Sequence, residues 1–181
     1  MLRAEATLRE LLRWDRALCI RLNRGLRHTM LVRALQGVSW LGNGIFWYTL
    51  MLALLLIHKG EAVLPVLHMA LVGAVCTGSY KMLKRGTVRP RPFQVMPGIA
   101  VGAPALDTFS FPSGHTLHAV AFTLVACSYY PDLAVALIPF TVLTAASRVV
   151  LGLHYPSDVA AGALIGAALA MLSMALVPLG A

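Results

Sequence analysis

Three short clusters of charged and polar residues interrupt an otherwise apolar sequence. Polar side chains are expensive to keep near hydrocarbon, so their presence beside long apolar runs indicates a functional site. The first cluster carries lysine and arginine, the second is a Pro-Ser-Gly-His run, and the third combines serine, arginine, histidine and aspartate. Their members are Lys84, Arg85, Arg89, Pro90, Arg91 and Pro92, then Pro112, Ser113, Gly114 and His115, and then Ser147, Arg148, His154 and Asp158.

The cations and donors in these clusters match the needs of a phosphoryl group. Lys84, Arg91 and Arg148 offer three fixed positive charges, and Ser113 offers a hydroxyl. Backbone N–H groups around Gly114 add donors where a helix is predicted to begin, and the helix dipole there also favours an anion. Several cationic and neutral donors that converge on one small anion form a phosphate site.

Two histidines supply the groups that phosphoryl transfer needs. A transfer without a metal requires a nucleophile and a proton donor, and histidine serves as either near neutral pH. Asp158 follows His154 by four residues, one turn on if the backbone is helical there. Its carboxylate could then hold the ring N–H and fix the tautomer. The residues alone do not divide the two roles between His115 and His154.

The composition places these clusters in a membrane protein. The chain has 181 residues, of which 59% are hydrophobic and 12% are charged, and its mean hydropathy is +0.76. These values exclude a disordered chain, and the counts of 15 Gly, 10 Pro and 3 Cys exclude a collagen-like or disulfide-rich scaffold. Several apolar runs reach membrane-spanning length. Basic residues beside those runs carry the net charge of +8, which indicates contact with anionic lipid and not with nucleic acid.

Five apolar runs predict an all-α, polytopic membrane helix bundle that occupies residues 34–181. Each run has the length of a membrane-spanning helix, about 20 residues. Gly162 and Gly166 lie four residues apart in the last run, a spacing that favours close helix packing. With five spans, the three polar clusters fall on one face of the membrane. The runs cover about 37–57, 62–83, 111–130, 133–151 and 157–179.

Residues 1–33 differ from the rest and predict an amphipathic helix that lies in the membrane interface. Leucines recur at helical spacing with arginines between them, and Trp14 suits the depth of the interface. A helix that binds a protein partner is the alternative for such a basic stretch. No continuous apolar core of a cleavable signal peptide is present in this segment. The residues are Leu8, Leu11, Leu12, Leu18 and Leu22, with Arg9, Arg13, Arg16, Arg21, Arg24 and Arg27.

Each polar cluster taken alone also has an interpretation without chemistry. Basic residues beside an apolar span usually set membrane topology, and Pro112-Ser113 is an ordinary helix start. A histidine next to Tyr155-Pro156 is typical of a membrane interface. Three such clusters on one face of so uncharged a chain are much harder to explain without a site. The combination therefore predicts chemistry on a phosphoryl group.

The same residues resemble the signature of the type-2 phosphatidic acid phosphatase family of membrane lipid phosphatases. Lys84 is followed after six residues by Arg91-Pro92, and the Pro-Ser-Gly-His run comes next. Ser147-Arg148 is then followed after five residues by His154 and, three residues later, by Asp158. The resemblance covers about 37–179. Many members of the family have six spans, whereas this sequence predicts five and an interfacial helix.

The resemblance implies a role for each residue of the signature. His154 would attack phosphorus and form a phosphohistidine, and Asp158 would orient it and balance its charge. His115 would protonate the leaving lipid oxygen and then activate water. The resemblance implies no metal and no other cofactor. The residues that would bind the phosphoryl oxygens are Lys84, Arg91, Ser113, Gly114 and Arg148.

The predicted function is hydrolysis of a lipid phosphate or diphosphate, with undecaprenyl diphosphate, phosphatidylglycerophosphate and phosphatidic acid as candidate substrates. A lipid phosphotransferase that uses the same phosphohistidine is one alternative, and a non-catalytic lipid-binding protein is another. We expect an integral protein of the bacterial cytoplasmic (inner) membrane. The N-terminal arginines indicate a cytoplasmic site, whereas the family resemblance implies an outward site. The oligomeric state and the membrane face are left open.

Several polar residues near the signature receive no catalytic role from the sequence. Lys81 has the wrong spacing to Arg91, and Asp107 lies in a loop where water could solvate it. His118 follows His115 by three residues and is expected to pack or to support the site from behind. Two further arginines could either steer an anionic headgroup or anchor the loop. They are Arg85 and Arg89.

Overall fold

The computed structural model describes residues 2–177 and is all-α over that range. The predicted fold class, an all-α membrane helix bundle, is confirmed. Residues 1 and 178–181, and the side chains of residues 2–5 and of Leu8, lie outside the description. The helices are α1 Leu2–Asn23, α2 Thr29–Leu41, α3 Ile45–His58, α4 Val63–Thr87, α5 Pro92–Val95, α6 Gly114–Tyr129, α7 Ala134–Val150 and α8 Pro156–Leu176, with short 3₁₀ turns at Arg24–Arg27, Lys59–Ala62 and Pro131–Leu133.

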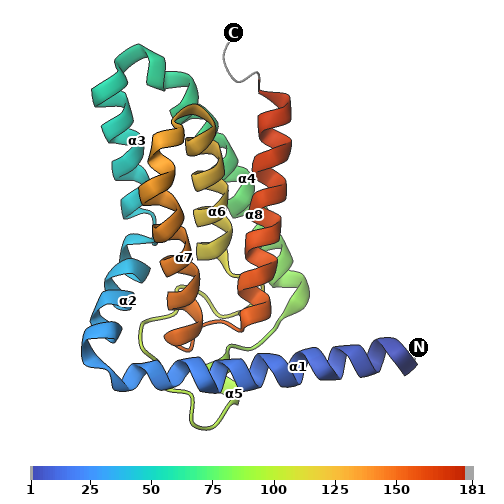
Figure 1. Cartoon of the computed structure of the whole chain (residues 1–181). Coiled ribbons are helices and arrows are strands. Elements are labelled where there is room, and N and C mark those ends of the chain that lie inside the picture. Colours follow the sequence, from blue (N-terminus) through green and yellow to red (C-terminus); the bar gives the residue numbers. More distant parts are fainter. Residues whose placement is uncertain (1, 178–181) are drawn as a thin grey trace.

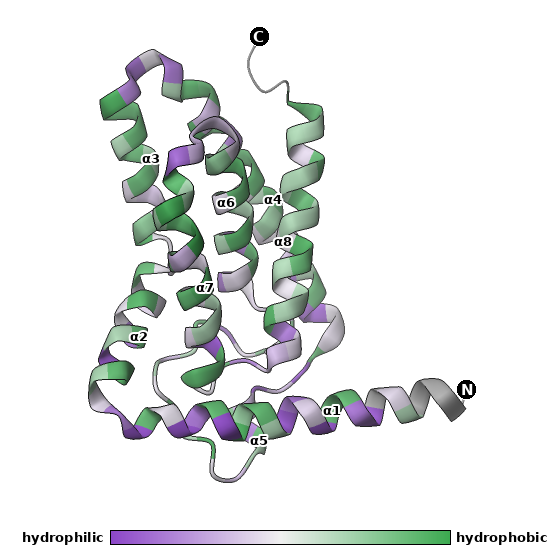
Figure 2. Cartoon of the chain, viewed as in Figure 1, coloured by the Kyte–Doolittle hydropathy of each residue, from purple (hydrophilic) through white to green (hydrophobic). Residues whose placement is uncertain are grey.

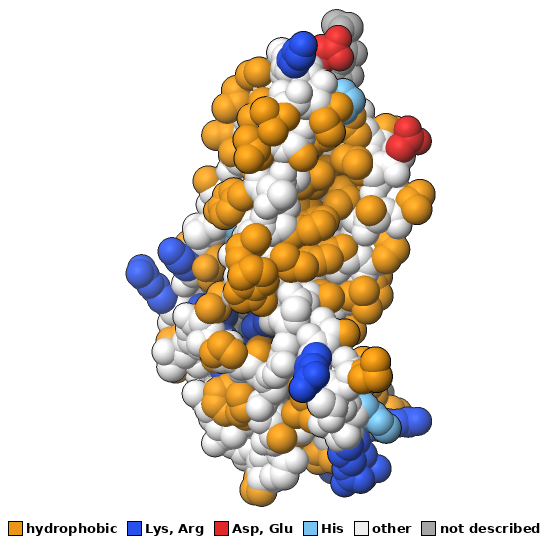
Figure 3. Space-filling model, turned by 90° about the vertical axis from the view of Figure 1, so that its left-hand side faces the viewer, with side chains coloured by type: hydrophobic (Ala, Val, Ile, Leu, Met, Phe, Trp, Pro, Cys, Tyr) orange, Lys and Arg blue, Asp and Glu red, His pale blue; other side chains and the backbone are white. Residues whose placement is uncertain are grey.

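The long helices α3, α4, α6, α7 and α8 run roughly side by side, and α1 crosses the lower end of this bundle (Figure 1). Hydropathy follows the same division: the bundle is mostly apolar, whereas α1 and the loops at the lower end alternate polar and apolar residues (Figure 2). One face of the molecule shows the same contrast, with an apolar upper half and most of its Lys and Arg side chains in the lower half (Figure 3).

Three stretches are long and apolar enough to cross a membrane in the part of the chain that is described. They are Ile45–Val95, which contains both α3 and α4, then Pro131–Val150 and Pro156–Leu176. Helix α6 has 16 residues, fewer than the ~20 of a typical span, and packs in the interior of the bundle. The predicted number of five spans therefore stays a prediction.

The predicted first span, about 37–57, is divided in the structure. Helix α2 ends at Leu41 and α3 begins at Ile45. Between them lies Gly42-Asn43-Gly44, where Gly44 has a φ of +120°, a left-handed backbone that glycine adopts without the steric cost of a β-carbon. The continuous helix expected here was wrong because apolar content outweighed the Gly-Asn-Gly signal, which is typical of a helix break.

Helices α6 and α8 approach each other closely at Gly162 and Gly166. A β-carbon added at Gly162 would lie 2.6 Å from the carbonyl oxygen of Ser113, and one added at Gly166 would lie 2.3 Å from that of Leu117. Both distances are far shorter than van der Waals contact. The close packing predicted from the spacing of these two glycines is confirmed, and it fixes the start of α6 against α8.

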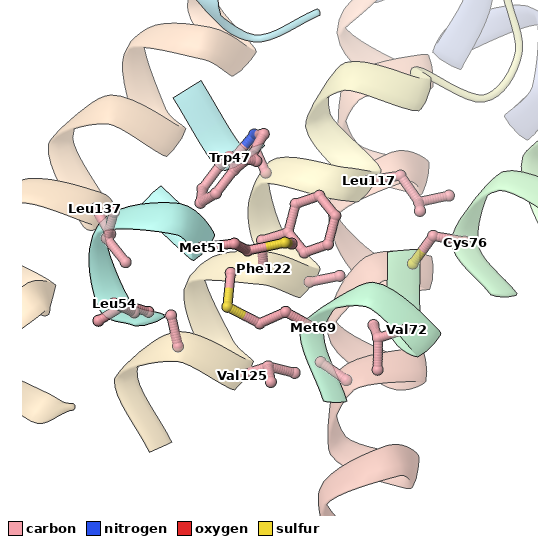
Figure 4. Packing of buried hydrophobic residues seen from close by; sticks show 14 of the residues in the cluster. Trp47, Met51, Leu54, Met69, Val72, Cys76, Leu117, Phe122, Val125 and Leu137 are labelled. Carbon is pink, nitrogen blue, oxygen red and sulfur yellow. The ribbon is translucent and has the colours of Figure 1, made fainter. Parts of the chain in front are cut away.

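The apolar core lies in the upper half of the bundle, between α3, α4 and α6. Trp47, Met69 and Phe122 are buried there (Figure 4). A polar network crosses the same region: the His68 ring nitrogens lie 2.9 Å from the Tyr129 hydroxyl and 3.0 Å from the Ser173 hydroxyl. These contacts satisfy a buried imidazole and join α4, α6 and α8 far from the polar clusters.

Helix α1 contacts the bundle through its polar and small residues. Asp15, Cys19 and Asn23, each four residues from the next, are buried, and the Asn23 amide donates to the carbonyl oxygens of Ala100 and Val150 at 2.9 and 3.0 Å. Large apolar side chains lie on the outward side instead. Among them are Leu11, Leu12, Trp14, Leu18, Ile20 and Leu22.

Replacing Gly166 by alanine should destabilise the fold. The new methyl would lie within 2.3 Å of a backbone oxygen, and overpacking of this kind costs about 1–3 kcal/mol. We expect a lower melting temperature of the detergent-purified protein. Gly78→Ala on α4 is the matched control, because nothing lies within 4 Å of its added β-carbon. Equal melting temperatures of the two variants would contradict the close α6–α8 contact.

Candidate active site

A cavity of about 690 Å³ lies where α3, α4 and α6 meet the loop that precedes α6. Its walls gather residues of all three polar clusters, and recessed basic side chains are visible at mid-height in Figure 3. Two predicted site residues, Ser113 and Asp158, are not on its surface and lie buried behind it. The predicted site residues on the wall are Lys84, Arg91, Gly114, His115, Arg148 and His154.

The turn between α7 and α8 places His154 against the cavity. Gly152 has a φ of +75°, and a β-carbon there would lie 2.6 Å from the Ala100 carbonyl oxygen, so the tight turn requires glycine. The backbone N–H groups of Leu153 and His154 both donate to the Arg148 carbonyl oxygen at 3.0 Å. His154 therefore precedes α8 and is not helical.

The His154 imidazole is buried between a cation and a carboxylate. Its Nε2 lies 3.2 Å from Arg91 Nη1, and its Nδ1 lies 3.6 Å from Asp158 Oδ2, just beyond hydrogen-bond distance. Because a guanidinium only donates, Nε2 accepts, and the ring proton is on Nδ1 facing Asp158. Nε2 is thus an unprotonated nitrogen at the cavity wall.

Burial keeps this imidazole neutral. It lowers the pKa of His154 from its ordinary 6.5 to about 4, an effect that the Asp158 carboxylate opposes and that the Arg148 and Arg91 charges strengthen. A desolvated ring surrounded by cations disfavours a further positive charge. At neutral pH His154 therefore has an unprotonated Nε2, whose lone pair accepts from Arg91 in this structure and is the one that a nucleophilic attack would use.

Asp158 is held from several sides. Its Oδ2 accepts from the Ser110 hydroxyl and, at 2.8 Å, from the Tyr155 backbone N–H. Its Oδ1 accepts from Arg89 Nη1 at 2.6 Å. These donors fix the carboxylate as an anion that is completely buried, since hydrogen bonds to the charged form favour it.

Helix α1 reaches this network through Asp15. Arg89 Nη2 donates to Asp15 Oδ2 at 2.8 Å, and the guanidinium carbon lies 3.9 Å from the centre of the Tyr155 ring. The Ser157 backbone N–H also donates to Asp15 Oδ1 at 2.9 Å. Arg89, for which two roles were open, thus anchors the loop and bridges two aspartates. Asp15 was missed, although its four-residue spacing to Cys19 is a usable signal.

Two cations of the first cluster, Lys84 and Arg91, share the carboxylate of Asp107, a residue that was not predicted to belong to the site. Lys84 Nζ lies 2.7 and 2.9 Å from the two oxygens of Asp107, and Arg91 Nη2 lies 2.7 Å from Oδ1. Partial burial alone would raise the pKa of Asp107, but Lys84 and Arg91 lower it below its usual value. Asp107 is open to water in its loop, with 38% of its side chain exposed, but its carboxylate also pairs with these two cations, which its place in the loop did not indicate.

Arg148 retains donor capacity at the cavity. Its Nη1 donates to the Ser39 hydroxyl on α2, whereas no group within residues 2–177 lies within hydrogen-bond distance of its Nε. The side chain is buried yet lines the cavity. An oxyanion in the cavity would supply the acceptor that such a buried donor needs.

His115 lies on the first turn of α6 and meets the break between α2 and α3. Its Nε2 is 2.6 Å from Asn43 Oδ1, and the amide oxygen only accepts, so Nε2 carries a proton. Asn43 was missed; the Gly-Asn-Gly signal could have found it. His118 also lines the cavity, and its ring is held with Nδ1 2.9 Å from the Gly114 carbonyl oxygen and Nε2 3.1 Å from the Thr77 hydroxyl.

Ser113 is placed differently from the expected phosphate ligand. Its hydroxyl lies 3.0 Å from the Thr116 hydroxyl, and its backbone N–H donates to the Asp158 carbonyl oxygen at 3.0 Å. In this structure Ser113 therefore joins α6 to α8, and its hydroxyl does not line the cavity. Gly114, the next residue, does line it.

Cations, a neutral buried histidine and a second histidine around one cavity in an apolar helix bundle define an integral-membrane phosphatase of phosphoric esters. The chain belongs to the PAP2 superfamily, whose family model matches residues 61–179. The family resemblance inferred from the signature is confirmed, and so is the expected class of enzyme, a phosphoric ester hydrolase with lipid phosphatase-like function.

Curated relatives carry phosphatase names. The chain is 35% identical over 129 residues to the decaprenylphosphoryl-5-phosphoribose phosphatase of Mycobacterium tuberculosis, a match that spans 61% of this chain and 70% of that protein. It is 41% identical over 64 residues to the lipid A 1-phosphatase of Rhizobium johnstonii. This second match spans 35% of the chain and only 26% of that relative.

Solved structures share the fold. A PAP2-type phosphatidylglycerolphosphate phosphatase from Bacillus subtilis superposes with a TM-score of 0.72 at 24% identity, covering 92% of this chain and 86% of that one. Aquifex aeolicus LpxE superposes with a TM-score of 0.69 at 25% identity, covering 86% of this chain and 92% of that one. The likeness extends over nearly all of the chain and establishes the bundle architecture.

The buried state of His154 predicts a pH dependence of stability. Its pKa falls from 6.5 in the unfolded chain to about 4 in the folded one, so the unfolded state binds the extra proton first as the pH falls. His154 therefore contributes stability above pH 6.5 that is progressively lost between pH 6.5 and 4. We expect melting temperatures over this window to fall less steeply in His154→Gln than in the wild type. Parallel curves would contradict the burial of a neutral imidazole.

Proposed function

We propose that this protein is a metal-independent lipid phosphatase that forms a phosphohistidine on His154. The proposal rests on one observation, the position of the His154 ring at a cavity lined by cations. Its Nε2 lies 3.2 Å from Arg91 Nη1, and its other ring nitrogen, Nδ1, is directed to Asp158. A nucleophile and the carboxylate that orients it are thereby set at one wall.

In the first step, the lone pair of His154 Nε2 attacks phosphorus and the bond from phosphorus to the lipid oxygen breaks. With the anionic substrate bound, His115 acts as the imidazolium, with a proton on each ring nitrogen. It gives the Nε2 proton, which lies beside Asn43, to the leaving oxygen and becomes neutral. Asp158 balances the positive charge that develops on the His154 ring. The products of this step are the free lipid alcohol, or the lipid monophosphate from a diphosphate, and phosphohistidine.

The cations of the cavity wall stabilise the negative charge on the transferred phosphoryl group. Lys84, Arg91 and Arg148 stabilise the equatorial oxygens, and the N–H groups at the start of α6 near Gly114 add neutral donors. The Ser113 hydroxyl contributes once it turns from Thr116 toward the cavity. In the second step, His115 takes a proton from water, the water oxygen attacks phosphorus, and the phosphorus–nitrogen bond breaks.

A lipid substrate suits the rest of the cavity. Apolar side chains of α3 and α6, including Trp47, Met51 and Phe122, form one part of its wall, and the exposed cations Lys81 and Arg85 lie along α4 at the basic part. Such a division fits an apolar chain and an anionic headgroup. We keep undecaprenyl diphosphate, phosphatidylglycerophosphate and phosphatidic acid as candidates, and the names of the relatives add a lipid A phosphate.

We place the catalytic unit, residues 34–181, in the bacterial cytoplasmic (inner) membrane and residues 1–33 in its interface. The outward apolar side chains of α1, such as Leu11 and Trp14, support this arrangement. Interfacial helices bury such a face at the headgroup boundary. In this arrangement the cavity opens close to the level of lipid phosphates.

The test is phosphate release by the detergent-purified protein in the presence of EDTA, with the four lipids as a panel. We expect release from at least one lipid, and a loss of more than about a thousandfold in His154→Ala, as for other removed nucleophiles. His28→Ala, an exposed histidine far along the chain, is the matched control and should retain activity.

Three outcomes would contradict this proposal. Release that survives His154→Ala would remove the phosphohistidine on that residue, and release that requires a divalent metal would remove the metal-independent mechanism. Folded protein that releases no phosphate from any of the four lipids would contradict hydrolysis. A phosphorylated acceptor lipid would then identify a transferase.

A further inference from the structure

Asp107 occupies the two cations that the proposed function assigns to the substrate. Its carboxylate lies 2.7 and 2.9 Å from Lys84 Nζ and 2.7 Å from Arg91 Nη2. Arg91 Nε also donates to the Asp107 backbone oxygen at 3.0 Å. A carboxylate that takes up a lysine and an arginine in this way makes the contacts that a phosphoryl group would make.

Lys84 and Arg91 use most of their N–H donors in contacts within the protein. An ammonium has three N–H donors and a guanidinium has five. Lys84 Nζ contacts both Asp107 oxygens and the Phe109 carbonyl oxygen at 2.8 Å. Arg91 donates to Asp107 through two nitrogens, and its Nη1 donates to the Leu153 carbonyl oxygen at 2.7 Å and contacts His154. A phosphoryl oxygen can therefore reach Lys84 only if a present partner leaves.

Among these partners, Asp107 is the one whose side chain can move into solvent. Its side chain is 38% exposed, whereas those of Lys84 and Arg91 are 7% and 1% exposed. It lies in the loop that precedes α6, outside the helices. A rotation of the Asp107 side chain can take its carboxylate from the two cations into water. The two cations are enclosed by protein and have no such path to water, and an unpaired charge in an apolar environment is costly.

We propose that Asp107 is an internal competitor of the substrate phosphoryl group: it neutralises Lys84 and Arg91 in the free protein and moves to solvent when the phosphoryl group binds. The identity of that group rests on the proposed function. The two buried cations therefore always have an anionic partner, either Asp107 or the phosphoryl group. Leaving them unpaired would be costly in a low-dielectric site. Free phosphate, which lacks a lipid chain to contribute binding energy, is displaced again by the returning carboxylate.

The proposal predicts an unusual variant. In Asp107→Asn the free protein loses the charge that neutralises its cations, while the anion-bound protein does not need that charge. The variant should melt at a lower temperature without anions, and inorganic phosphate or orthovanadate should bind at least about tenfold more tightly than to the wild type, since nearby like charges repel strongly. Saturating anion should close most of the gap in melting temperature.

The experiment measures anion binding by calorimetry and by thermal shift in detergent, so it needs no turnover. Asp107→Glu should retain weak anion binding, because the longer side chain still presents a carboxylate. Asp132→Asn is the matched control for net charge: Asp132 is an exposed acidic residue in the turn before α7, and its removal should leave anion affinity unchanged.

Unchanged or weaker anion binding by Asp107→Asn would overturn the proposal and would make Asp107 a residue that positions the cations for the substrate. If that variant does not fold, hydrogen exchange of the wild type decides: vanadate should accelerate exchange of the loop amides around 104–110, and unchanged exchange would overturn the proposal. Tight anion binding by Asp107→Asn, together with no hydrolysis of any lipid by the wild type, would refute the proposed function but not the role of Asp107.

Discussion

Charge pairing inside an apolar bundle is the constraint on which the rest of this structure depends. Three carboxylates, those of Asp15, Asp107 and Asp158, are paired with cations of one short segment, residues 84–91. Removing one partner of a buried pair costs about 3–5 kcal/mol, because the remaining charge is left uncompensated. The carboxylates come from α1, from the loop before α6 and from α8. The pairing therefore holds three distant parts of the chain around a single basic segment.

Close packing of α8 on α6 supplies the second part of the site. Because Gly162 and Gly166 present no side chain, the backbone of α6 lies directly against α8, and the Ser113 N–H reaches the Asp158 carbonyl oxygen at 3.0 Å. The glycines thus set the second cluster beside the third. A larger residue at either position would separate the start of α6 from Asp158, whose Oδ2 lies 3.6 Å from His154 Nδ1.

The sequence predicted those features that depend on local pattern or spacing. The all-α fold, the close contact at the two glycines and the wall residues of the three clusters follow from hydropathy, small-residue spacing and residue type. Features that depend on contacts between distant segments did not follow. Asp15 meets Ser157 across 142 residues of sequence, and Asn43 meets His115 across 72. Asp107 and Asn43 lie outside helices, where no helical periodicity of the sequence indicates which way a side chain points.

In the proposed mechanism, His154 carries the phosphoryl group between lipid and water. The most direct measurement mixes the purified protein with a hydrolysed lipid, quenches the reaction in alkali within its first turnover, and locates phosphate on tryptic peptides by mass spectrometry. We expect phosphate on the imidazole of His154, and none when the same lipid is mixed with His154→Gln. Phosphate on another residue, or a first turnover that proceeds with unmodified protein throughout, would contradict the proposed mechanism.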